Sequence, residues 1–477
     1  MEINPFIFRN YDIRGIVDVD LDSEKVEAIG KAYGTLLRKR KIRQAVMGWD
    51  CRTSGEMFKD AFTRGLISTG VDVIQLGIIM TQMMYYAQYN FQTNGGVMIT
   101  ASHNPHNFNG FKLGIGFSLT TGPEDVQEIK RCVENENYVR AEEWGHISKE
   151  NITKNYFQDV LKRIKINKKF KVVIDPRHGT TALYLPEILR RAGCEVICLH
   201  ENVDGNFPAG TPDPTDEKFM TELGKVVLDH KADLGFAFDG DGDRIGVVDE
   251  KGRILWNDVL VAIFAKEILE RFPNSKIIYN GLCSQVVPLV ITKNGGQPII
   301  WRTGHSFIKS KIAEEGAAFG GELSGHFFFN DNAYGHDDGA YAALRLLEYL
   351  SEKNTSLSAL YETFPHYISS PEIKIGCPDD KKVEIIQTIS KSFKQDFPDN
   401  KITDSTIIPG DDGTRIDFSD GMIIFRYSQN GPYITVKFEA KDQETYTQRK
   451  SYVRKTLKQY PEMIWQDQLC VNLESLE

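Results

Sequence analysis

The chain has 477 residues, of which 41% are hydrophobic and 26% charged; this composition is typical of globular proteins, and the length suffices for roughly three to four domains. Its formal net charge of -9 argues against a nucleic-acid partner, so any phosphate would be bound by local basic groups. No run reaches the ~18 apolar residues of a membrane helix, Met1–Asn10 lacks the regions of a signal peptide, and the seven cysteines have no metal-type spacing, so we expect a soluble cytoplasmic protein without a membrane partner.

Three parts of the chain repeat one plan: an apolar strand, a polar loop, a helix, a glycine and a second strand. The strands that open the three repeats are residues 45–50, 171–175 and 276–280. The helices are followed by Gly70, Gly193 and Gly295, at the position where a helix end needs a left-handed backbone. These glycines are separated by the length of a domain, so the pattern predicts duplicated α/β domains rather than a short-repeat solenoid.

The end of the chain follows a different plan. A helical pattern near 383–397 comes first, and a last helix is predicted near 443–458. Between them lie three strands of alternating polarity joined by Gly- and Asp-rich turns: 414–418, 422–426 and 433–438. This order predicts an α+β domain with an antiparallel sheet. The predicted division is domain I (1–150), domain II (151–254), domain III (255–368) and domain IV (369–477).

A serine loop follows the apolar strand 96–99 of domain I. It reads Thr-Ala-Ser-His-Asn-Pro over residues 100–105, and its proline restricts the backbone around Ser102. A serine hydrolase would need G-x-S-x-G, which is absent here, and His103 is adjacent in sequence and so poorly placed as a base. A phosphorylated serine that faces a metal loop fits better, and a buried turn serine without chemistry is the alternative.

The most informative motif is the acidic loop Asp-Gly-Asp-Gly-Asp-Arg at residues 239–244. It lies between the apolar strands 234–238 and 245–248, and therefore at strand ends, where α/β folds place their chemistry. Like charges this close repel by roughly 1 kcal/mol per pair even in water, so the loop requires a cation. The two glycines free the backbone so that Asp239, Asp241 and Asp243 can converge on one point.

The ion that this loop predicts is magnesium. A calcium EF-hand is excluded because its sixth position must be glycine, whereas Arg244 stands there, and because the flanking segments are strands rather than helices. Three carboxylates provide oxygen ligands for a hard ion, with an open position for a phosphate oxygen. A solvated acidic turn without an ion is the alternative.

With both loops in this order, the chain resembles the α-D-phosphohexomutase family, and most closely its bacterial phosphomannomutase/phosphoglucomutase branch. The resemblance covers the whole chain, because further segments are similar to family motifs: 8–15, 104–112, 303–309, 321–326, 337–339 and 426–432. It implies four domains around one cleft, three related α/β domains and a C-terminal α+β domain. It also implies reversible transfer of phosphate between O1 and O6 of mannose or glucose.

The resemblance further implies a phosphoserine mechanism. Ser102 would carry the phosphate at rest, and a hexose 1,6-bisphosphate would be both intermediate and activator. Mg²⁺ would be held by Asp239, Asp241, Asp243 and a phosphoserine oxygen of Ser102. The partner would be a phosphosugar substrate, and the chain would be a monomer or a homodimer.

The same resemblance implies roles for the remaining site residues. Arg244 would donate to the transferring phosphoryl group, and Lys112 or His326 would move the proton of the sugar hydroxyl. The residues that would bind the sugar, hold its non-reacting phosphate or close the cleft are Tyr11, Arg14, His305, Glu322, Ser324, Arg426, Ser428, Asn430 and Gly431.

Two positions depart from the family pattern. Leu282 and Gln285 stand in the loop of the third repeat, where many relatives carry Lys and Arg. The loss of two positive charges should weaken phosphosugar binding, unless another cation of this domain substitutes for them. The candidates from the sequence are Lys293, Arg302 and Lys309.

This departure leaves two other functions open. One is a sugar-phosphate-binding protein of the same fold with little catalysis, and the other is a mutase for another phosphosugar such as glucosamine phosphate. Leu323 is apolar, as in relatives that use mannose and glucose phosphates, which is a weak argument against the second. The intact Ser102 and the full aspartate triplet favour a mutase over a binding protein.

Overall fold

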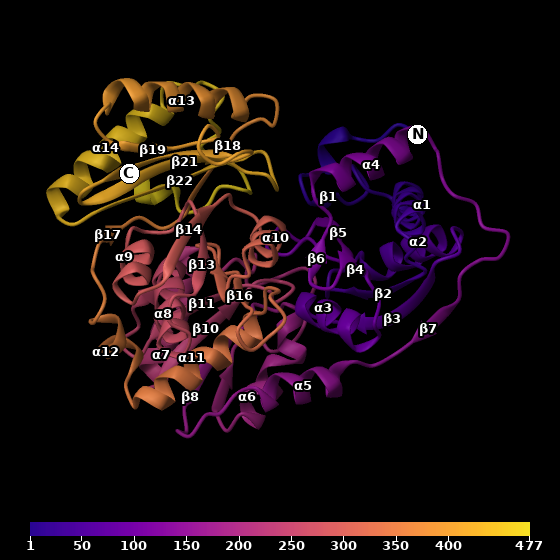
Figure 1. Cartoon of the computed structure of the whole chain (residues 1–477), viewed down its shortest axis with the longest axis horizontal. Coiled ribbons are helices and arrows are strands. Elements are labelled where there is room, and N and C mark those ends of the chain that lie inside the picture. Colours follow the sequence, from indigo (N-terminus) through magenta and orange to yellow (C-terminus); the bar gives the residue numbers. More distant parts are fainter.

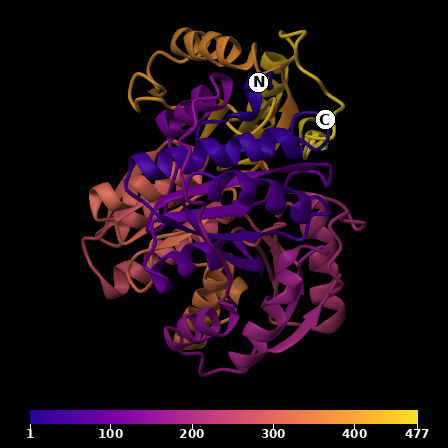
Figure 2. The same cartoon turned by 90° about the vertical axis from the view of Figure 1, so that its right-hand side faces the viewer.

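A computed structural model describes the whole chain, residues 1–477, as four β-sheets that follow one another along the sequence and are covered by helices (Figure 1). Figure 1 shows domain I on the right and domain IV at the upper left, above domains II and III. In Figure 2, turned by 90°, domain I lies in front, with domain IV at the top and domain II at the bottom. The predicted fold class of three α/β domains and a C-terminal α+β domain is confirmed.

Domain I contains a seven-stranded sheet in the order β1-β5-β4-β2-β3-β7, with β6 paired to β5. Its strands are β1 (Asp12–Ile16), β2 (Gln44–Trp49), β3 (Asp72–Ile78), β4 (Gly95–Ile99), β5 (Phe108–Gly116), β6 (Leu119–Thr120) and β7 (Ile147–Lys149). Its helices are α1 (Ser23–Lys39), α2 (Gly55–Ile67), α3 (Thr81–Asn90) and α4 (Pro123–Glu134), after the short η1 (Pro5–Ile7). Side chains alternate between the faces of the sheet, so Ala45 and Met47 pack with α1 and α2, whereas Val46 joins the core around α3.

Domain II contains a five-stranded sheet in the order β12-β11-β10-β8-β9. The strands are β8 (Lys171–Asp175), β9 (Glu195–Cys198), β10 (Leu234–Phe238), β11 (Ile245–Asp249) and β12 (Ile254–Leu255). The helices are α5 (Thr153–Lys162), η2 (Thr180–Leu183), α6 (Leu185–Arg191) and α7 (Glu217–His230). β8 is parallel to β9 and β10, whereas β10 and β11 form an antiparallel pair. The loop 239–244 therefore closes a hairpin, and no residue separates it from either strand.

Domain III contains a four-stranded sheet in the order β14-β13-β15-β16. The strands are β13 (Lys276–Asn280), β14 (Gln297–Trp301), β15 (Phe319–Gly321) and β16 (Phe327–Phe329). The helices are α8 (Asn257–Arg271), α9 (Val286–Lys293), α10 (His305–Glu315), α11 (Gly339–Lys353) and α12 (Leu357–Tyr361). One continuous apolar core joins this domain to domain II and to the α3 side of domain I.

Domain IV contains an antiparallel sheet in the order β17-β22-β21-β20-β19, with β18 paired to β22. The strands are β17 (Ile368–Ser369), β18 (Ile373–Gly376), β19 (Lys401–Thr403), β20 (Gly413–Phe418), β21 (Gly421–Tyr427) and β22 (Tyr433–Ala440). The helices are α13 (Lys382–Asp396), α14 (Gln443–Leu457) and η3 (Leu473–Leu476). None of the helices in the structure is both long and apolar enough to cross a membrane.

The sheet of domain IV is buried on both faces. Ile434, Val436 and Phe438 of β22 belong to the apolar core beneath α13 and α14. The alternate residues Lys437 and Glu439 point to the opposite face and have no solvent exposure either. Lys437 pairs with Asp258 of domain III, and Glu439 accepts a hydrogen bond of 2.9 Å from the backbone N–H of Gln285. The polar face therefore docks domain IV onto domain III.

The elements predicted from the sequence agree with the structure to within a few residues. The strands predicted at 414–418, 422–426 and 433–438 are β20, β21 and β22, and the two helices predicted around them are α13 and α14. The predicted domain boundaries after 254 and 368 fall inside the short strands β12 and β17. As domain limits, all of the predicted boundaries stay predictions.

The glycines at the ends of the repeated helices have the left-handed backbone that the sequence predicts. The φ angles are +75° for Gly70, +94° for Gly193 and +76° for Gly295. A Cβ atom added at Gly295 would meet no atom within 4 Å, so only its backbone conformation requires glycine there.

We expect Gly295→Ala to lower the free energy of unfolding by about 1–2 kcal/mol, because an L-residue with a Cβ is strained in the left-handed region. Gly295→Asn should recover much of this loss, since asparagine tolerates that conformation. Differential scanning calorimetry of the three proteins measures the difference. Equal melting temperatures for Gly295→Ala and the wild type would contradict the assigned conformation.

Candidate active site

Three buried carboxylates converge at the loop between β10 and β11. Asp239, Asp241 and Asp243 have no solvent exposure, and one oxygen from each lies within 4.8 Å of the others. Gly242 makes the turn at φ +81°, and its N–H donates to Asp239 Oδ1 at 3.0 Å. The N–H of Arg244 donates to the same oxygen at 3.2 Å. The loop backbone thus orients Asp239, while its other oxygen remains available to other groups.

Domain I contributes the groups that face this loop. The Nζ atom of Lys112, on β5, lies 2.8 Å from Asp241 Oδ2 and also pairs with Asp243. The hydroxyl of Thr81 donates to Asp241 Oδ2 at 2.6 Å. Burial opposes ionisation, but the Lys112 ammonium and these hydrogen bonds lower the pKa of Asp241. Burial and then its two neighbouring carboxylates raise the pKa of Asp239 well above its usual range.

The charges at this loop fit a divalent cation. Oδ1 of Asp241 and Oδ1 of Asp243 are buried and have no hydrogen-bond partner. A buried acceptor without a partner is costly, and a carboxylate oxygen is the ligand that Mg²⁺ prefers. Lys112 and Arg244 supply two positive charges against three carboxylates, and burial and the neighbouring carboxylates still raise the pKa of Asp239.

Ser102 lies directly against the acidic loop. Its Oγ donates to Asp239 Oδ2 at 2.6 Å and is 3.2 Å from His103 Nδ1. The backbone of Ser102 is left-handed, with φ +52°, which is strained for a residue with a Cβ. The predicted serine loop and the predicted metal loop, separated in the sequence by more than a domain length, are therefore in contact.

Arg52 maintains the conformation of the serine loop, and the motif analysis did not assign it to the site. Its guanidinium donates to the backbone oxygens of Ser102 at 2.8 Å and Asn104 at 2.7 Å. Asp50 pairs with Arg52 from the end of β2, with an Oδ2 to Nε distance of 3.2 Å. Arg14, which the sequence placed at the cleft, contacts the same loop through Asn104 Oδ1 at 3.0 Å.

A chain of polar contacts continues from the acidic loop into domain III. Arg244 Nε donates to His326 Nε2 at 2.9 Å, and His326 Nδ1 lies 2.9 Å from Asp337 Oδ2. Because a guanidinium can only donate, Nε2 is the acceptor and the proton of a neutral His326 is on Nδ1, next to Asp337. In this arrangement Nε2 of His326 is hydrogen-bonded to Arg244, Nδ1 lies beside Asp337 without a hydrogen bond, and the ammonium of Lys112 is paired with Asp241 and Asp243.

The predicted phosphate loop of domain IV is shaped by residues that the sequence analysis did not single out. Arg426, at the end of β21, forms a two-pronged pair with Asp412, with Nε 3.1 Å from Oδ1. Lys382 Nζ donates to the backbone oxygens of Ser428 at 2.7 Å and Gly431 at 3.0 Å. The Ser428 hydroxyl accepts from the N–H of Asn430 at 3.0 Å. Asp412 and Lys382 contact the loop from outside its sequence, so the motif gave no signal for them.

A small cavity, called here the site cavity, connects these groups and has a volume of about 40 Å³. All four domains line it. Nine of the predicted site residues contribute to its wall: Tyr11, Arg244, His305, Glu322, Ser324, His326, Arg426, Ser428 and Asn430. The cavity wall does not include Lys112, Arg14, Gly431, the three aspartates or Ser102. His103, which follows Ser102 in the sequence, is the residue of the serine loop that lines it. Glu372 and Lys374 line it and lie outside every motif, whereas Gln429 lines it from within the motif 426–432 but was not assigned to the site.

One aromatic ring, Tyr11, and one carboxylate, Glu322, shape the domain III side of the site cavity. The Tyr11 ring lies edge-on to His305, with centroids 4.8 Å apart, and burial raises the pKa of its hydroxyl. Glu322 lines the cavity, and its Oε1 accepts from the N–H of Gly304 at 2.7 Å, which leaves its second oxygen without a hydrogen bond. Tyr11 thus links domain I to domain III across the site.

The two departures from the family pattern have different surroundings. Leu282 has no solvent exposure and lines the site cavity. Gln285 lies outside it, and its amide donates to the backbone oxygens of Phe418 and Gly421, both at 2.8 Å. The sequence treated the two positions as one charge loss in the cleft, but Gln285 is a contact between domains III and IV.

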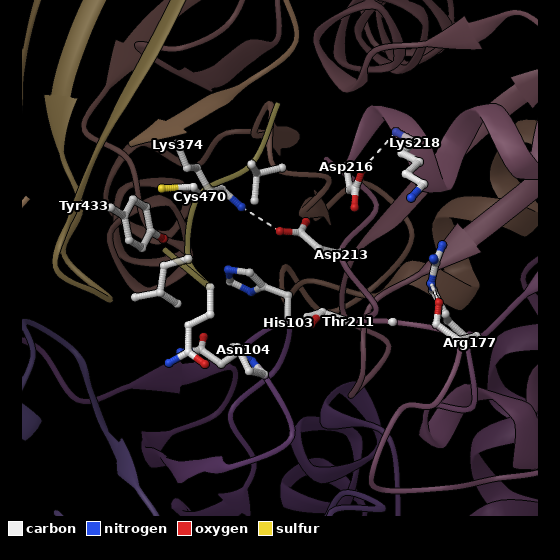
Figure 3. A pocket seen from close by; sticks show the side chains of 16 residues that line it. His103, Asn104, Arg177, Thr211, Asp213, Asp216, Lys218, Lys374, Tyr433 and Cys470 are labelled. Carbon is white, nitrogen blue, oxygen red and sulfur yellow. Dashed lines mark hydrogen bonds and ion pairs between the residues drawn. The ribbon is translucent and has the colours of Figure 1, made fainter. Parts of the chain in front are cut away.

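An adjoining cavity of about 330 Å³ lies between domains I, II and IV (Figure 3). His103, Lys374 and Tyr433 line both cavities. The larger one is also lined by Arg177, Thr211, Asp213, Asp216, Lys218 and the segment 468–471. The two cavities therefore meet at Lys374, next to the serine loop.

Comparison with known proteins assigns the chain a consistent set of relatives. Family models described as phosphoglucomutase/phosphomannomutase alpha/beta/alpha domains I, II and III match residues 5–140, 154–252 and 256–367. A phosphomannomutase/phosphoglucomutase from Pseudomonas syringae pv. tomato is 38% identical over 437 residues, 92% of this chain and 92% of that protein. A phosphoglucomutase from Neisseria gonorrhoeae is 34% identical over 460 residues, 96% of this chain and 98% of that protein.

A solved structure agrees with these relatives. The crystal structure of a phosphoglucomutase/phosphomannomutase family protein from Burkholderia thailandensis matches with a TM-score of 0.85 at 31% identity. The match covers 96% of this chain and 98% of that chain, so all four domains take part in it.

We expect Asp239→Asn to raise the melting temperature of the metal-free protein at pH 7 by a few degrees and to reduce its response to Mg²⁺. The folded pKa of Asp239 is raised above its unfolded value of about 4. The folded chain therefore gains a proton at this site, and stability is lost as the pH rises from about 4 through the folded pKa. An amide removes that loss together with one metal ligand, and thermal-shift measurements with and without Mg²⁺ test both effects.

Asp249→Asn is the matched control, because Asp249 is a fully buried carboxylate at the end of the same hairpin, paired with Arg253 at 2.9 Å. It should destabilise the protein and leave the Mg²⁺-induced shift unchanged. A wild-type response to Mg²⁺ in Asp239→Asn would remove this aspartate from the metal site.

Proposed function

The chain belongs to the phosphoglucomutase/phosphomannomutase family, and from this premise we propose that it interconverts the 1-phosphate and the 6-phosphate of mannose or glucose through a phosphoserine and a hexose 1,6-bisphosphate. One observation carries the proposal: the hydroxyl of Ser102 donates to Asp239 within a buried aspartate triplet, beside a cavity lined by all four domains. The names of the relatives favour this reaction over a binding protein without catalysis.

Ser102 is the proposed phosphoryl carrier. The bond between phosphorus and Ser102 Oγ breaks as a bond forms to the O1 or O6 hydroxyl of the sugar, whose proton passes to a base. The 1,6-bisphosphate then turns over in the cleft and returns its other phosphoryl group to Ser102 Oγ. Asp239, Asp241, Asp243 and a phosphoserine oxygen would hold Mg²⁺, which when bound neutralises charge on the phosphoryl group.

Arg244 and His326 are proposed to act as a pair. Arg244 Nε donates to His326 Nε2 in the structure, at 2.9 Å. When the guanidinium turns to donate to the phosphoryl group, Nε2 becomes free to accept the proton of the sugar hydroxyl, while Asp337 holds the proton on Nδ1. Lys112 is the second candidate to hold or move this proton; although burial opposes it, Asp241 and Asp243 raise its pKa, so it acts first as a cation.

The remaining wall residues are proposed to bind the substrate. Glu322 and Ser324 accept from and donate to the sugar hydroxyls, with His305 beside them. Arg426, Ser428 and the backbone N–H groups of Asn430 and Gly431 hold the phosphate that does not react. Tyr11 and Arg14 close the site from domain I. The cytoplasmic location, the lack of nucleic-acid and membrane partners, and the monomeric or homodimeric state stay predictions from the sequence.

A coupled mutase assay tests the proposed function. Glucose 1-phosphate and mannose 1-phosphate are each supplied with Mg²⁺ and a catalytic amount of glucose 1,6-bisphosphate, and formation of the 6-phosphate is followed. We expect turnover of at least one sugar phosphate that chelation of the metal abolishes and Mg²⁺ restores. No conversion of either substrate by the complete system would refute the proposal.

Ser102→Ala should reduce turnover to background, because the proposed carrier oxygen is removed. Intact-protein mass spectrometry of the wild type after incubation with the bisphosphate should show one added phosphoryl group, and Ser102→Ala should show none. Ser118→Ala is the control: Ser118 is a buried serine of the same domain whose hydroxyl donates to the backbone oxygen of Tyr334 at 2.9 Å. Substantial turnover by Ser102→Ala would exclude the phosphoserine mechanism.

A further inference from the structure

We propose that Lys374 of domain IV binds the non-reacting phosphate of the substrate through the N–H donor that its ion pair with Asp213 of domain II leaves free. The inference rests on the proposed function and adds to it a binding residue that no sequence motif contains. This lysine lies at the contact between domains II and IV, where the two cavities meet.

The register of the domain IV sheet places Lys374 in line with Arg426. Thr435 of β22 is directly opposite Lys374 of β18 on one side and Arg426 of β21 on the other. Residues opposite one another on neighbouring strands point to the same face of a sheet, and neighbouring strands are about 4.8 Å apart. The two cations therefore project from the same face, two strand spacings apart, and both line the site cavity.

Lys374 is buried but remains at the cavity wall. Its residue is 4% exposed, and it lines both the site cavity and the larger adjoining one. Figure 3 shows Lys374 and Asp213 reaching toward each other, with His103 of the serine loop nearby and Tyr433 on the other side. Lys374 therefore lies where the two cavities adjoin, beside the serine loop.

The hydrogen bonds of Lys374 leave one donor for a ligand. Its Nζ lies 2.6 Å from Asp213 Oδ2 and 3.2 Å from Thr215 Oγ1. An ammonium has three N–H donors, so one has no partner in the structure. A phosphate oxygen is a strong acceptor for it, because both groups are charged.

The charge balance of the site cavity calls for this third cation. Arg244, Lys374 and Arg426 are the cationic side chains of its wall, and Glu322 and Glu372 are the anionic ones. Arg426 is already paired with Asp412, and Glu372 Oε2 is buried without a hydrogen-bond partner. A phosphate dianion beside these groups needs more positive charge than Arg426 retains, and Lys374 is the other cation of that sheet that lines the site cavity.

The cations that the sequence offered as substitutes lie elsewhere. Lys293 is exposed near the end of α9, Arg302 stacks on Phe307 at 3.5 Å, and Lys309 Nζ donates to Tyr85 and lies 3.3 Å from Asp337. None of the three lines the site cavity. We therefore assign to Lys374 the compensation for the apolar Leu282, which lines the same cavity.

Lys374→Met tests the proposal, because methionine keeps the apolar stem and removes the ammonium. We expect the KM for the sugar 1-phosphate that the wild type turns over to rise about tenfold to a hundredfold, as for the loss of one charged hydrogen bond, with kcat within about threefold of wild type. The salt dependence of KM should also decrease, since screening acts on one charge fewer. Calorimetric titration of the 6-phosphate into Ser102→Ala, with and without Lys374→Met, should show the same rise in Kd.

Two further variants separate phosphate binding from a merely structural pair. Asp213→Asn removes the partner of Lys374 and leaves the ammonium, so KM should stay within about threefold of wild type or fall. Lys437→Met removes another buried ammonium of the same sheet face, which pairs with Asp258 and lines neither cavity. It should lower the melting temperature and leave KM within about threefold. Should Lys374→Met not fold, Lys374→Gln replaces it, with the same expected rise in KM.

An unchanged KM in the Lys374 variant would overturn the inference. An equal rise in KM for Lys374→Met and Asp213→Asn would also overturn it, because the pair would then only connect domains II and IV. The activity of the wild type distinguishes a failure of this inference from a failure of the proposed function. If the wild type turns over substrate and the Lys374 variant has the same KM, only this inference is contradicted. No turnover by the wild type contradicts the proposed function and this inference with it.

Discussion

The arrangement of the first three domains depends on the burial of three carboxylates in the loop 239–244. Buried charges are stable only when other charges or hydrogen bonds compensate them, and within this loop Arg244 is the one positive charge, 3.9 Å from Asp239 Oδ2. Lys112 and Ser102 come to it from domain I, and Arg244 connects it to His326 of domain III. The relative position of the three domains is therefore part of the charge balance of one loop, which the proposed divalent cation would complete.

Domain IV obeys a second constraint of the same kind. Its sheet has one apolar face, which packs on α13 and α14, and one charged face that is also buried. A charged face can be buried only where groups of opposite charge pair with it. Lys437 pairs with Asp258 of domain III, and Lys374 pairs with Asp213 of domain II. Where the face meets the cavities, the compensation is incomplete, because Lys374 keeps a free donor. The same alternation of side chains thus produces both the docking contacts and the groups that can receive an anionic substrate.

The local part of the fold could be predicted from the sequence because its causes are local. Alternating polarity located β20, β21 and β22 to within two residues, and the glycine after each repeated helix has the left-handed backbone that the helix end requires. The two loops with the strongest chemistry, 100–105 and 239–244, were recognisable because consecutive residues determine their shape and charge. The expectation that they meet came from charge, because a phosphorylated serine suits a metal loop, and the contact between Ser102 and Asp239 confirms that the two loops meet.

The tertiary structure alone decided how equivalent residues differ. The sequence presents the three aspartates as alike, but Lys112 and Thr81 lower the pKa of Asp241, whereas burial and its neighbours raise that of Asp239. It groups Leu282 with Gln285, but one lines the cavity and the other joins two domains. Lys374 belongs to no sequence motif, because its ion-pair partner, Asp213, is 161 residues away in the chain. Pattern and composition determine what a segment can form; the electrostatic state of a buried group depends on neighbours that only the folded chain brings together.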